Sequence, residues 1–261
     1  MTSGKQPHPG PTSEAARTLH PTAGPPRPWR VRPQLSLAEL DAGAPELTRL
    51  QMQLLANRGI VGAADAFAYL RASWRATPPE PLGLAKAVAR VRMARTRQER
   101  VVVFGDYDVD GLTSCALMVL ALRQMGIDTS AYLPSRSDDG RGLNAAAVRE
   151  LANGGASLVV TTDCSTTNVA EVQLATSLGL DVVITDHHAP QGEIAAACAV
   201  VNPRQLGCPS TEKNLAGVGV ALRVAEALLT GAETGSDNDT LDALLDLVAV
   251  GTIGDVVALT K

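Results

Sequence analysis

The chain has 261 residues, of which 45% are hydrophobic and 19% charged, and its formal net charge is −4. This composition is ordinary for a soluble globular protein of one large or two small domains, and it argues against a generally basic nucleic-acid coat. No stretch approaches the ~20 apolar residues of a membrane span, and no apolar signal segment follows the N-terminus. The four cysteines lack Cys-x-x-Cys spacing, which argues against a zinc knuckle and fits a reducing cytoplasm.

The first 33 residues differ in composition from the rest of the chain. They hold eight of the sixteen prolines and five basic residues against one acidic residue. Since no hydrophobic period runs through them, we expect a disordered, Pro-rich leader at 1–33. Apolar residues at helical spacing follow in the stretches 45–56, 63–74 and 82–97, which predicts a small helical lead-in at 34–98.

From residue 99 onward, apolar runs alternate with helical patterns. Strands are expected at Val101–Gly105, Thr129–Leu133, Leu158–Thr162, Val182–Thr185 and Ala199–Val201. Helices are expected at Leu112–Met125, Asn144–Asn153, Asn168–Leu178, Val218–Leu229 and Thr240–Val250. The strands are apolar throughout, which is typical of a parallel sheet that is buried on both faces. The predicted fold class is therefore α/β: a parallel, doubly wound sheet of about five strands with helices on both faces.

Acidic residues and histidines follow three of these expected strands. The first strand runs into Asp106-Tyr107-Asp108-Val109-Asp110-Gly111, the third into Asp163, and the fourth into Asp186-His187-His188. Because the carboxyl ends of parallel strands share one edge of an open sheet, we expect these side chains to converge. Their composition is that of a metal centre.

The Asp-x-Asp-x-Asp-Gly segment at 106–111 first suggests an EF-hand calcium loop. That loop needs a Glu at its twelfth position, where this chain has Leu117, and a helix rather than a strand before it. The EF-hand interpretation therefore fails. We interpret the segment as an extended loop in which Gly111 gives the backbone room to turn and the carboxylates hold divalent cations.

Each of these residues also has an ordinary interpretation. A single Asp after a strand is usually a helix cap or a turn residue, and for Asp163 alone that interpretation is preferred. Their joint occurrence favours function, because clustered carboxylates are costly unless cations neutralise them. Carboxylates with imidazole suit manganese better than calcium, and two ions ~3.5–4 Å apart would favour hydrolysis of a phosphate ester.

Four ordered motifs resemble those of the DHH phosphoesterase superfamily. They are Val-Val-Val-Phe-Gly-Asp-Tyr-Asp-Val-Asp-Gly from Val101, Val-Val-Thr-Thr-Asp-Cys from Val159, Val-Ile-Thr-Asp-His-His from Val183 and Gly-Thr-Ile-Gly-Asp-Val-Val from Gly251. Within the superfamily the chain is most similar to the RecJ-type single-strand-specific 5′ to 3′ DNA exonucleases. Three further stretches carry that similarity: Asp139–Asn144, Val201–Gln205 with Cys208-Pro209, and Leu215–Val220.

The resemblance implies a two-metal site that holds Mn²⁺ or Mg²⁺. Asp108 would bind one ion and Asp110 the other, while Asp163 would bridge them. His187 and Asp255 would complete the shell of the second ion.

Other residues receive implied roles around that site. Asp106 would stand near the first ion, and Asp186 would orient an imidazole. His188 would face the scissile phosphate, and Arg136 and Arg141 would contact phosphates of the DNA backbone. The implied catalytic residues are His188, Asp110 and Asp163.

The chain departs from the pattern of the superfamily at two positions and at its end. Ser165 stands where Gly is usual, and Gly254 stands where Ala is common, but neither removes a ligand. RecJ proteins normally continue into a DHH-associated domain and an OB-fold domain. We therefore expect residues 99–261 to be the DHH phosphoesterase part of a longer protein, with weak hydrolysis and without processivity when alone.

The expected function is metal-dependent phosphodiester hydrolysis of single-stranded DNA in repair and recombination. We expect a cytoplasmic monomer, with no membrane association and with a single-strand-binding protein or a helicase as candidate partners. Two alternatives stay open: a small-substrate DHH hydrolase acting on oligoribonucleotides, cyclic dinucleotides or pyrophosphate, and a non-catalytic DHH module. A substrate panel separates the first alternative, and a Mn²⁺ titration separates the second.

Overall fold

The computed structural model describes residues 33, 46–70, 79–134, 142–230 and 238–259. The chain divides into two compact units, at residues 1–73 and 74–261. Apart from Pro33, the leader predicted at 1–33 lies outside the described residues. Among the helices that are described, none has the length and apolar character needed to cross a bilayer.

The first unit contains two short helices, α2 (Arg49–Ala56) and α3 (Ala63–Leu70), where the sequence predicted helical stretches. Thr48 starts α2 in a capping box: its hydroxyl accepts from the backbone N–H of Gln51, and the Gln51 side chain accepts from the backbone N–H of Thr48. The small core of this unit consists of Met52, Leu55, Ile60 and Ala66.

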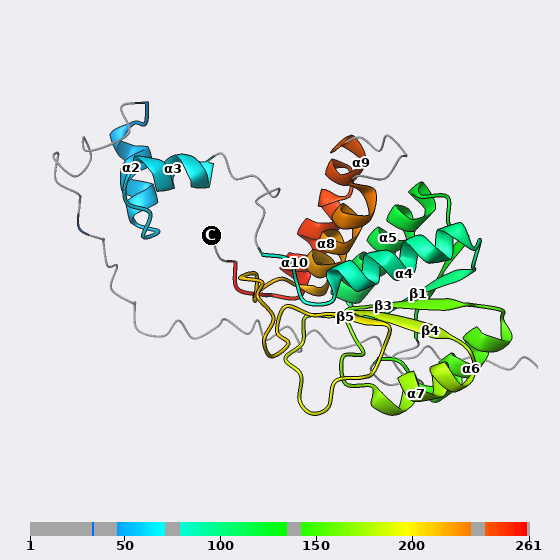
Figure 1. Ribbon diagram of the computed structural model, residues 1–261. Helices are drawn as coiled ribbons and strands as arrows, with labels where there is room; N and C mark the ends of the chain where they lie inside the picture. The colour runs from blue at the N-terminus through cyan, green and yellow to red at the C-terminus, as the bar shows by residue number, and fades with distance from the viewer. Residues whose placement is uncertain (1–32, 34–45, 71–78, 135–141, 231–237, 260–261) are drawn as a thin grey trace, which may run out of the picture. The chain divides into compact units, whose positions relative to one another are not determined.

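The second unit is built on a five-stranded sheet in the order β2-β1-β3-β4-β5 (Figure 1). Its strands are β1 (Val101–Gly105), β2 (Thr129–Tyr132), β3 (Leu158–Thr162), β4 (Asp181–Thr185) and β5 (Ala199–Val201). All neighbouring strands pair in parallel, which confirms the predicted class of sheet. The strand order reverses between β1 and β3, and ligands of such sheets bind outside the carboxyl ends of the strands at this switch point.

Helices cover both faces of the sheet, as predicted (Figure 1). One face carries α4 (Leu84–Thr96), α5 (Val109–Gln124), α8 (Gly217–Leu229) and α10 (Leu245–Gly254), and the short α9 (Asn238–Asp242) precedes α10. The other face carries α6 (Ala145–Asn153) and α7 (Val169–Ser177). Alternate strand residues serve the two cores: Val101 and Val103 pack on the first face, Val102 and Phe104 on the second.

The helix α4 belongs to the second unit, whereas the sequence placed it in the lead-in that ends at residue 98. Its apolar residues at helical spacing, Leu84, Ala87, Val91 and Ala94, are buried in the same core as β1. On this buried side Arg90 forms ion pairs with Glu99 at 2.7 Å and with Asp181 at 2.6 Å. A helical period shows that one face is apolar, but it does not show which part of the molecule that face packs against.

The helix α5 starts three residues earlier than predicted, so Asp110 and Gly111 lie in its first turn instead of in an extended loop. Gly111 also has a different role from the predicted one, which was to let the backbone turn in a loop. A Cβ atom at this position would overlap the carbonyl oxygen of Asp106, so only glycine lets α5 start this close to the end of β1.

The helix predicted at 240–250 is two helices, α9 and α10. The second one continues to Gly254, which makes Asp255 its C-terminal cap. The acid of the fourth motif is therefore carried by a helix end rather than by a loop.

Candidate metal centre

Polar residues that follow four strands meet at the carboxyl edge of the sheet. Asp106 follows β1, Asp163 follows β3, Asp186 and His187 follow β4, and Asn202 follows β5. All five are at most 5% exposed. Buried polar groups this dense are costly unless they pair or bind an ion.

Two helix ends bring further acids to this edge. Asp108 is the N-cap of α5, and its Oδ1 accepts from the backbone N–H of Gly111 at 3.0 Å. Asp255 caps the C-terminus of α10, where its side chain is 25% exposed.

Asp110 lies inside the edge, with an exposure of only 1%. Its two oxygens accept hydrogen bonds from the backbone N–H groups of Gly217 at 2.6 Å and Val218 at 2.8 Å, at the start of α8. Burial raises the pKa of Asp110, although these two hydrogen bonds act in the opposite direction. The positive end of α8 thus fixes the direction of this carboxylate.

The ligand-type atoms of these residues form three overlapping groups. Within each group they lie within 4.8 Å of one another: Asp106, Asp108 and Asp163; Asp110, His187 and Asp255; Asp163, His187 and His188. Asp163 and His187 each belong to two groups, so the three groups form one continuous centre. The structure therefore brings together all six residues that the sequence predicted as metal ligands.

The middle of this centre is short of hydrogen bonds. Oδ1 of Asp163 and both ring nitrogens of His187 are buried and make no hydrogen bond with any described residue. Nε2 of His187 lies 3.1 Å from Oδ1 of Asp163, 3.6 Å from Oδ2 of Asp255 and 3.7 Å from Oδ2 of Asp110. Buried polar atoms are nearly always paired, and three carboxylates around an imidazole nitrogen suit a divalent cation such as Mn²⁺.

The charge state of Asp163 fits the same conclusion. Burial, together with the nearby charge of Asp110, raises the pKa of Asp163 to about 9. A carboxyl group in these surroundings gives up its proton at neutral pH only when a positive charge replaces it. The backbone of Gly217 packs closely against Asp163, because a Cβ at Gly217 would lie 2.6 Å from both Cβ and Oδ1 of Asp163.

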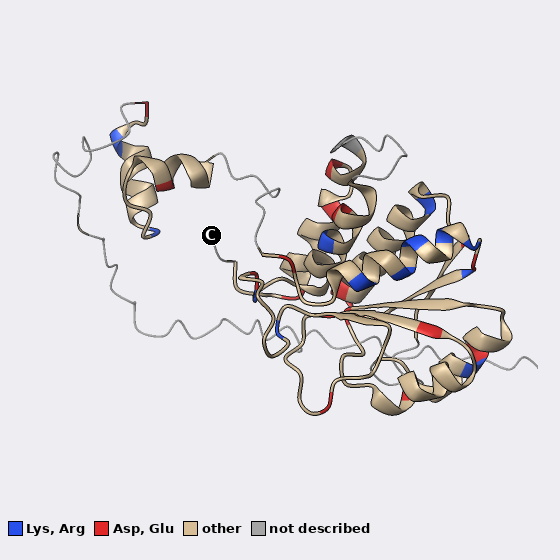
Figure 2. Ribbon diagram, in the orientation of Figure 1, with Lys and Arg blue, Asp and Glu red and all other residues tan. Residues whose placement is uncertain are grey.

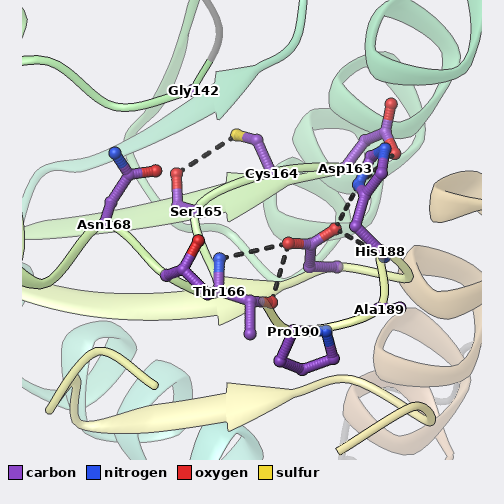
Figure 3. Close-up of a pocket in the computed structure, with 11 residues that line it drawn as sticks. Gly142, Asp163, Cys164, Ser165, Thr166, Asn168, His188, Ala189 and Pro190 are labelled. Carbon is purple, nitrogen blue, oxygen red and sulfur yellow. Dashed lines mark hydrogen bonds and ion pairs between the residues drawn. The ribbon is translucent and has the colours of Figure 1, made fainter. Parts of the chain in front are cut away.

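Asp186 has the opposite surroundings. Its Oδ1 accepts from the backbone N–H groups of His187 at 2.7 Å and His188 at 3.1 Å, and lies 2.8 Å from Nδ1 of the His188 ring. Its Oδ2 accepts from the backbone N–H of Thr166 at 3.1 Å and from the Thr166 hydroxyl at 2.7 Å (Figure 3). Burial acts to raise the pKa of Asp186, but the bonds from His188 and Thr166 outweigh it and lower the pKa.

Comparison with known proteins decides the family. The model of the DHH family, N-terminal domain, matches residues 100–252, which is more than half of the chain. The chain belongs to the DHH family. The resemblance to this family is thereby confirmed, and the matched residues include every residue of the centre except Asp255, which follows the end of the match.

Relatives of this DHH chain are named as RecJ. The chain is 40% identical over 215 residues to the single-stranded-DNA-specific exonuclease RecJ of Bacillus subtilis, a match that covers 82% of this chain and 26% of that protein. It is 40% identical over 232 residues to the Escherichia coli RecJ, covering 85% of this chain and 39% of that protein. The chain thus spans well under half the length of these two curated relatives.

Solved structures agree with this assignment. A crystal structure of exonuclease RecJ bound to manganese is 35% identical, with a TM-score of 0.61, over 68% of this chain and 44% of that one. RecJ from Thermus thermophilus has been solved with Mn²⁺, at 30% identity and a TM-score of 0.64 over 87% of this chain and 32% of that one. The same protein with Mg²⁺ matches at 27% identity and a TM-score of 0.53, over 87% of this chain and 28% of that one.

A cavity of about 240 Å³ opens beside the candidate metal centre (Figure 3). Its wall includes Asp163, Ser165, Thr166, Asn168 and His188. The His188 ring is 42% exposed, and its Nδ1 is held by Asp186. Nε2 is therefore the ring nitrogen left for a ligand in the cavity.

The two departures from the usual DHH pattern have local effects. Ser165 has a φ of +83°, a left-handed conformation that glycine adopts without strain, which explains why Gly is usual there. Its hydroxyl accepts from the backbone N–H of Leu143 at 3.2 Å. At Gly254, a Cβ would lie 2.7 Å from a methyl group of Val109, so the Ala that is common elsewhere would press on this side chain.

The sequence predicted two site residues that the structure does not describe, and it missed two others. Arg136 and Arg141 lie outside the described residues, so their predicted role stays a prediction. Thr166 and Asn202, which surround Asp186 and His188, were missed. Asn202 had two signals, its position directly after the fifth predicted strand and its place in the RecJ-like stretch Val201–Gln205, whereas Thr166 had none.

Proposed function

We propose that this chain carries the metal-binding catalytic part of a RecJ-type exonuclease, which hydrolyses phosphodiester bonds of single-stranded DNA from the 5′ end with two Mn²⁺ or Mg²⁺ ions. The observation that carries the proposal is the buried pair of Asp163 and His187, whose facing atoms lie 3.1 Å apart and make no hydrogen bond with any described residue. The names of the relatives support the choice of single-stranded DNA as substrate.

The geometry supports a division of ligands between two ions. Asp108, with Asp106 beside it, belongs to the group for the first ion. Asp110, His187 and Asp255 form the group for the second ion. Asp163 stands in the first group and 3.1 Å from His187 of the second, which suits a bridging ligand.

Bound ions of this kind activate a water molecule and neutralise charge on a phosphoryl oxygen. The protein's own residues orient the reaction. His188 presents Nε2 to the cavity, where the doubly protonated ring, with Nδ1 bonded to Asp186, donates a hydrogen bond from Nε2 to the scissile phosphate and stabilises developing charge. Two backbone N–H groups at the start of α8 hold Asp110, and Asp163 occupies space that a Cβ at Gly217 would fill, so both carboxylates are placed before an ion binds. We assign the catalytic roles to His188, Asp110 and Asp163.

Contacts to the DNA backbone need basic groups. Among the described residues that line the cavity there is no Lys or Arg, and Figure 2 shows basic residues gathered along α4 instead. We therefore assign phosphate contacts to Arg136 and Arg141, which precede the cavity residue Gly142 in the sequence. The wider role that we assign is DNA repair and recombination in the cytoplasm, as a monomer with a single-strand-binding protein or a helicase as partner.

The test is release of nucleotides from a 5′-labelled single-stranded DNA in the presence of Mn²⁺. We expect the wild-type chain to release label and Asp110→Asn to be slower by ~100-fold or more. Asp128→Asn is the matched control, because Asp128 is exposed and precedes β2 at the opposite edge of the sheet.

Two results would overturn the proposal. The first is equal release of label by the wild-type chain and by Asp110→Asn. The second is cleavage of dinucleotides or pyrophosphate without any cleavage of longer strands, which would assign the chain to the small-substrate hydrolases of the family.

A further inference from the structure

We propose that Thr166 and Asn202 are positioning residues, which hold the ring of His188 in one orientation and one tautomer by acting through Asp186. The kinetic consequence rests on the proposed function, in which His188 faces the phosphate. The structural consequence does not, and it can be measured without metal or substrate.

Asn202 is the first residue of the hydrogen-bond chain that leads to the His188 ring. It is fully buried and directly follows β5. Its Nδ2 donates to the hydroxyl of Thr166 at 3.0 Å and to the carbonyl oxygen of His188 at 2.8 Å. Its Oδ1 accepts from the backbone N–H of Arg204 at 2.8 Å. The amide therefore has one correct orientation, because a flip would set its NH₂ against an N–H and its oxygen against a carbonyl.

The hydrogen bond from Asn202 to Thr166 determines which group the Thr166 hydroxyl donates to. A hydroxyl has a single proton to donate. Since its oxygen accepts from Asn202, the proton is free to go to Oδ2 of Asp186, which lies 2.7 Å away. The chain of donors thus runs from Asn202 to Thr166 to Asp186, and bonds aligned in this way strengthen one another.

Asp186 is thereby locked against rotation. Thr166 holds Oδ2 with both its backbone N–H and its hydroxyl. Oδ1 is left facing His188, whose Nδ1 lies 2.8 Å away. A carboxylate fixed on one side in this way accepts the Nδ1 proton of His188 and directs Nε2 to the cavity.

The residues involved follow three neighbouring strands of the sheet. Thr166 lies in the turn between β3 and α7, Asp186 and His188 follow β4, and Asn202 follows β5. The bond from Asn202 to the His188 carbonyl also fixes the backbone that carries the ring. Removing the Thr166 hydroxyl leaves Oδ2 of Asp186 with only its backbone bond, so both the carboxylate and the ring gain freedom.

The kinetic test compares three substitutions of the full chain. We expect Thr166→Val to lower kcat on single-stranded DNA by ~10-fold, while KM and Mn²⁺ affinity stay within about twofold of wild type. Thr166→Ser keeps the hydroxyl and should restore kcat. Thr176→Val is the matched control, because the Thr176 hydroxyl bonds only the carbonyl of Val172 within α7, at 3.0 Å.

The structural test reads the His188 ring directly, by long-range ¹H–¹⁵N NMR of the metal-free chain labelled at histidine. His188→Asn identifies the signal among the four histidines of the chain. At a pH where the ring is neutral, we expect one Nδ1–H tautomer in the wild type and in Thr166→Ser, and a mixture of tautomers in Thr166→Val. Loss of DNA cleavage by the wild type would overturn the proposed function and leave this readout intact. An unchanged tautomer in Thr166→Val would overturn the positioning role.

Discussion

Asp163 and Asp186 are buried carboxylates at the ends of neighbouring strands, but they differ in their hydrogen bonds and in the direction in which their pKa is shifted. Asp186 is held through both of its oxygens by the ring of His188, the hydroxyl of Thr166 and three backbone N–H groups, and its pKa is lowered. Asp163 has an oxygen that is buried without a hydrogen bond to any described residue, and its pKa is raised to about 9. The protein stabilises the charge of Asp186 itself, whereas the charge of Asp163 is left for a cation to stabilise.

The largest expected effect of a substitution separates these two positions. In metal-free protein at pH 8, Asp186→Asn should lower the free energy of unfolding by ~3 kcal/mol, because the amide NH₂ would face groups that donate to the carboxylate. Asp163→Asn should leave that free energy unchanged or raise it, since the amide carries no charge that needs compensation. Urea denaturation of both variants measures the difference. Equal destabilisation by the two substitutions would remove the contrast between the sites.

A smaller effect is expected from closing the space beside Asp163. Gly217→Ala puts a Cβ 2.6 Å from the Asp163 side chain, so either the start of α8 or the carboxylate must move. We expect a loss of ~2 kcal/mol in stability, accompanied by weaker Mn²⁺ binding. Gly219→Ala is the control, because the three atoms nearest to its Cβ would belong to the Leu215 side chain, at 3.0 Å and beyond, and none to Asp163. Unchanged metal affinity in Gly217→Ala would show that this contact does not place the carboxylate.

The pH dependence of stability follows from the raised pKa of Asp163. Between the ordinary Asp value near 4 and about 9, the folded chain holds a proton on Asp163 that the unfolded chain has released. The contribution of this group is therefore full below pH ~4 and is lost as the pH rises toward 9. We expect the free energy of unfolding without metal to fall between pH 6 and 9 by up to ~1.4 kcal/mol per pH unit.

Two controls isolate this slope. Asp163→Asn has no carboxyl group to titrate at this position, so it should lose this part of the pH dependence. Saturating Mn²⁺ replaces the proton and should also flatten the slope. Denaturation curves at several pH values test both, and identical slopes for the wild type and Asp163→Asn would contradict the assignment of the proton to Asp163.

The smallest effect concerns the turn that joins the two environments. Ser165 carries a φ of +83° in the segment between Asp163 and Thr166. Ser165→Gly relieves the strain and Ser165→Ala retains it, while both remove the hydroxyl. We expect the glycine variant to be more stable than the alanine variant by ~1 kcal/mol, measured by thermal denaturation. Equal melting temperatures would mean that the turn relaxes without cost.

The sequence predicted the sheet and the convergence of its acids because both follow from strong local patterns. Apolar runs such as 101–105 and 158–162 show no alternation, which is typical of strands buried on both faces. Once the strands are parallel, the residues that follow them must share an edge. The residues at 106, 163 and 186–188 could therefore be placed together without any knowledge of their contacts.

Other features could not be predicted because they depend on partners distant in the sequence. The segment 106–111 looks like a loop, since its acids alternate with other residues, yet Asp108 acts as an N-cap and starts α5 at Val109. Thr166 and Asn202 have no chemical signature of their own, because hydroxyl and amide side chains are common after strands. Their role comes from bonds that span 20 and 36 positions of the chain.

The central claim is that the charge of Asp163 is completed by a cation while that of Asp186 is completed by the protein. Isothermal titration of the metal-free chain with Mn²⁺ tests it most directly. We predict that the wild type binds two ions and that Asp163→Asn binds them ~100-fold more weakly or not at all. Mn²⁺ binding by Asp163→Asn with the stoichiometry and affinity of the wild type would contradict the account.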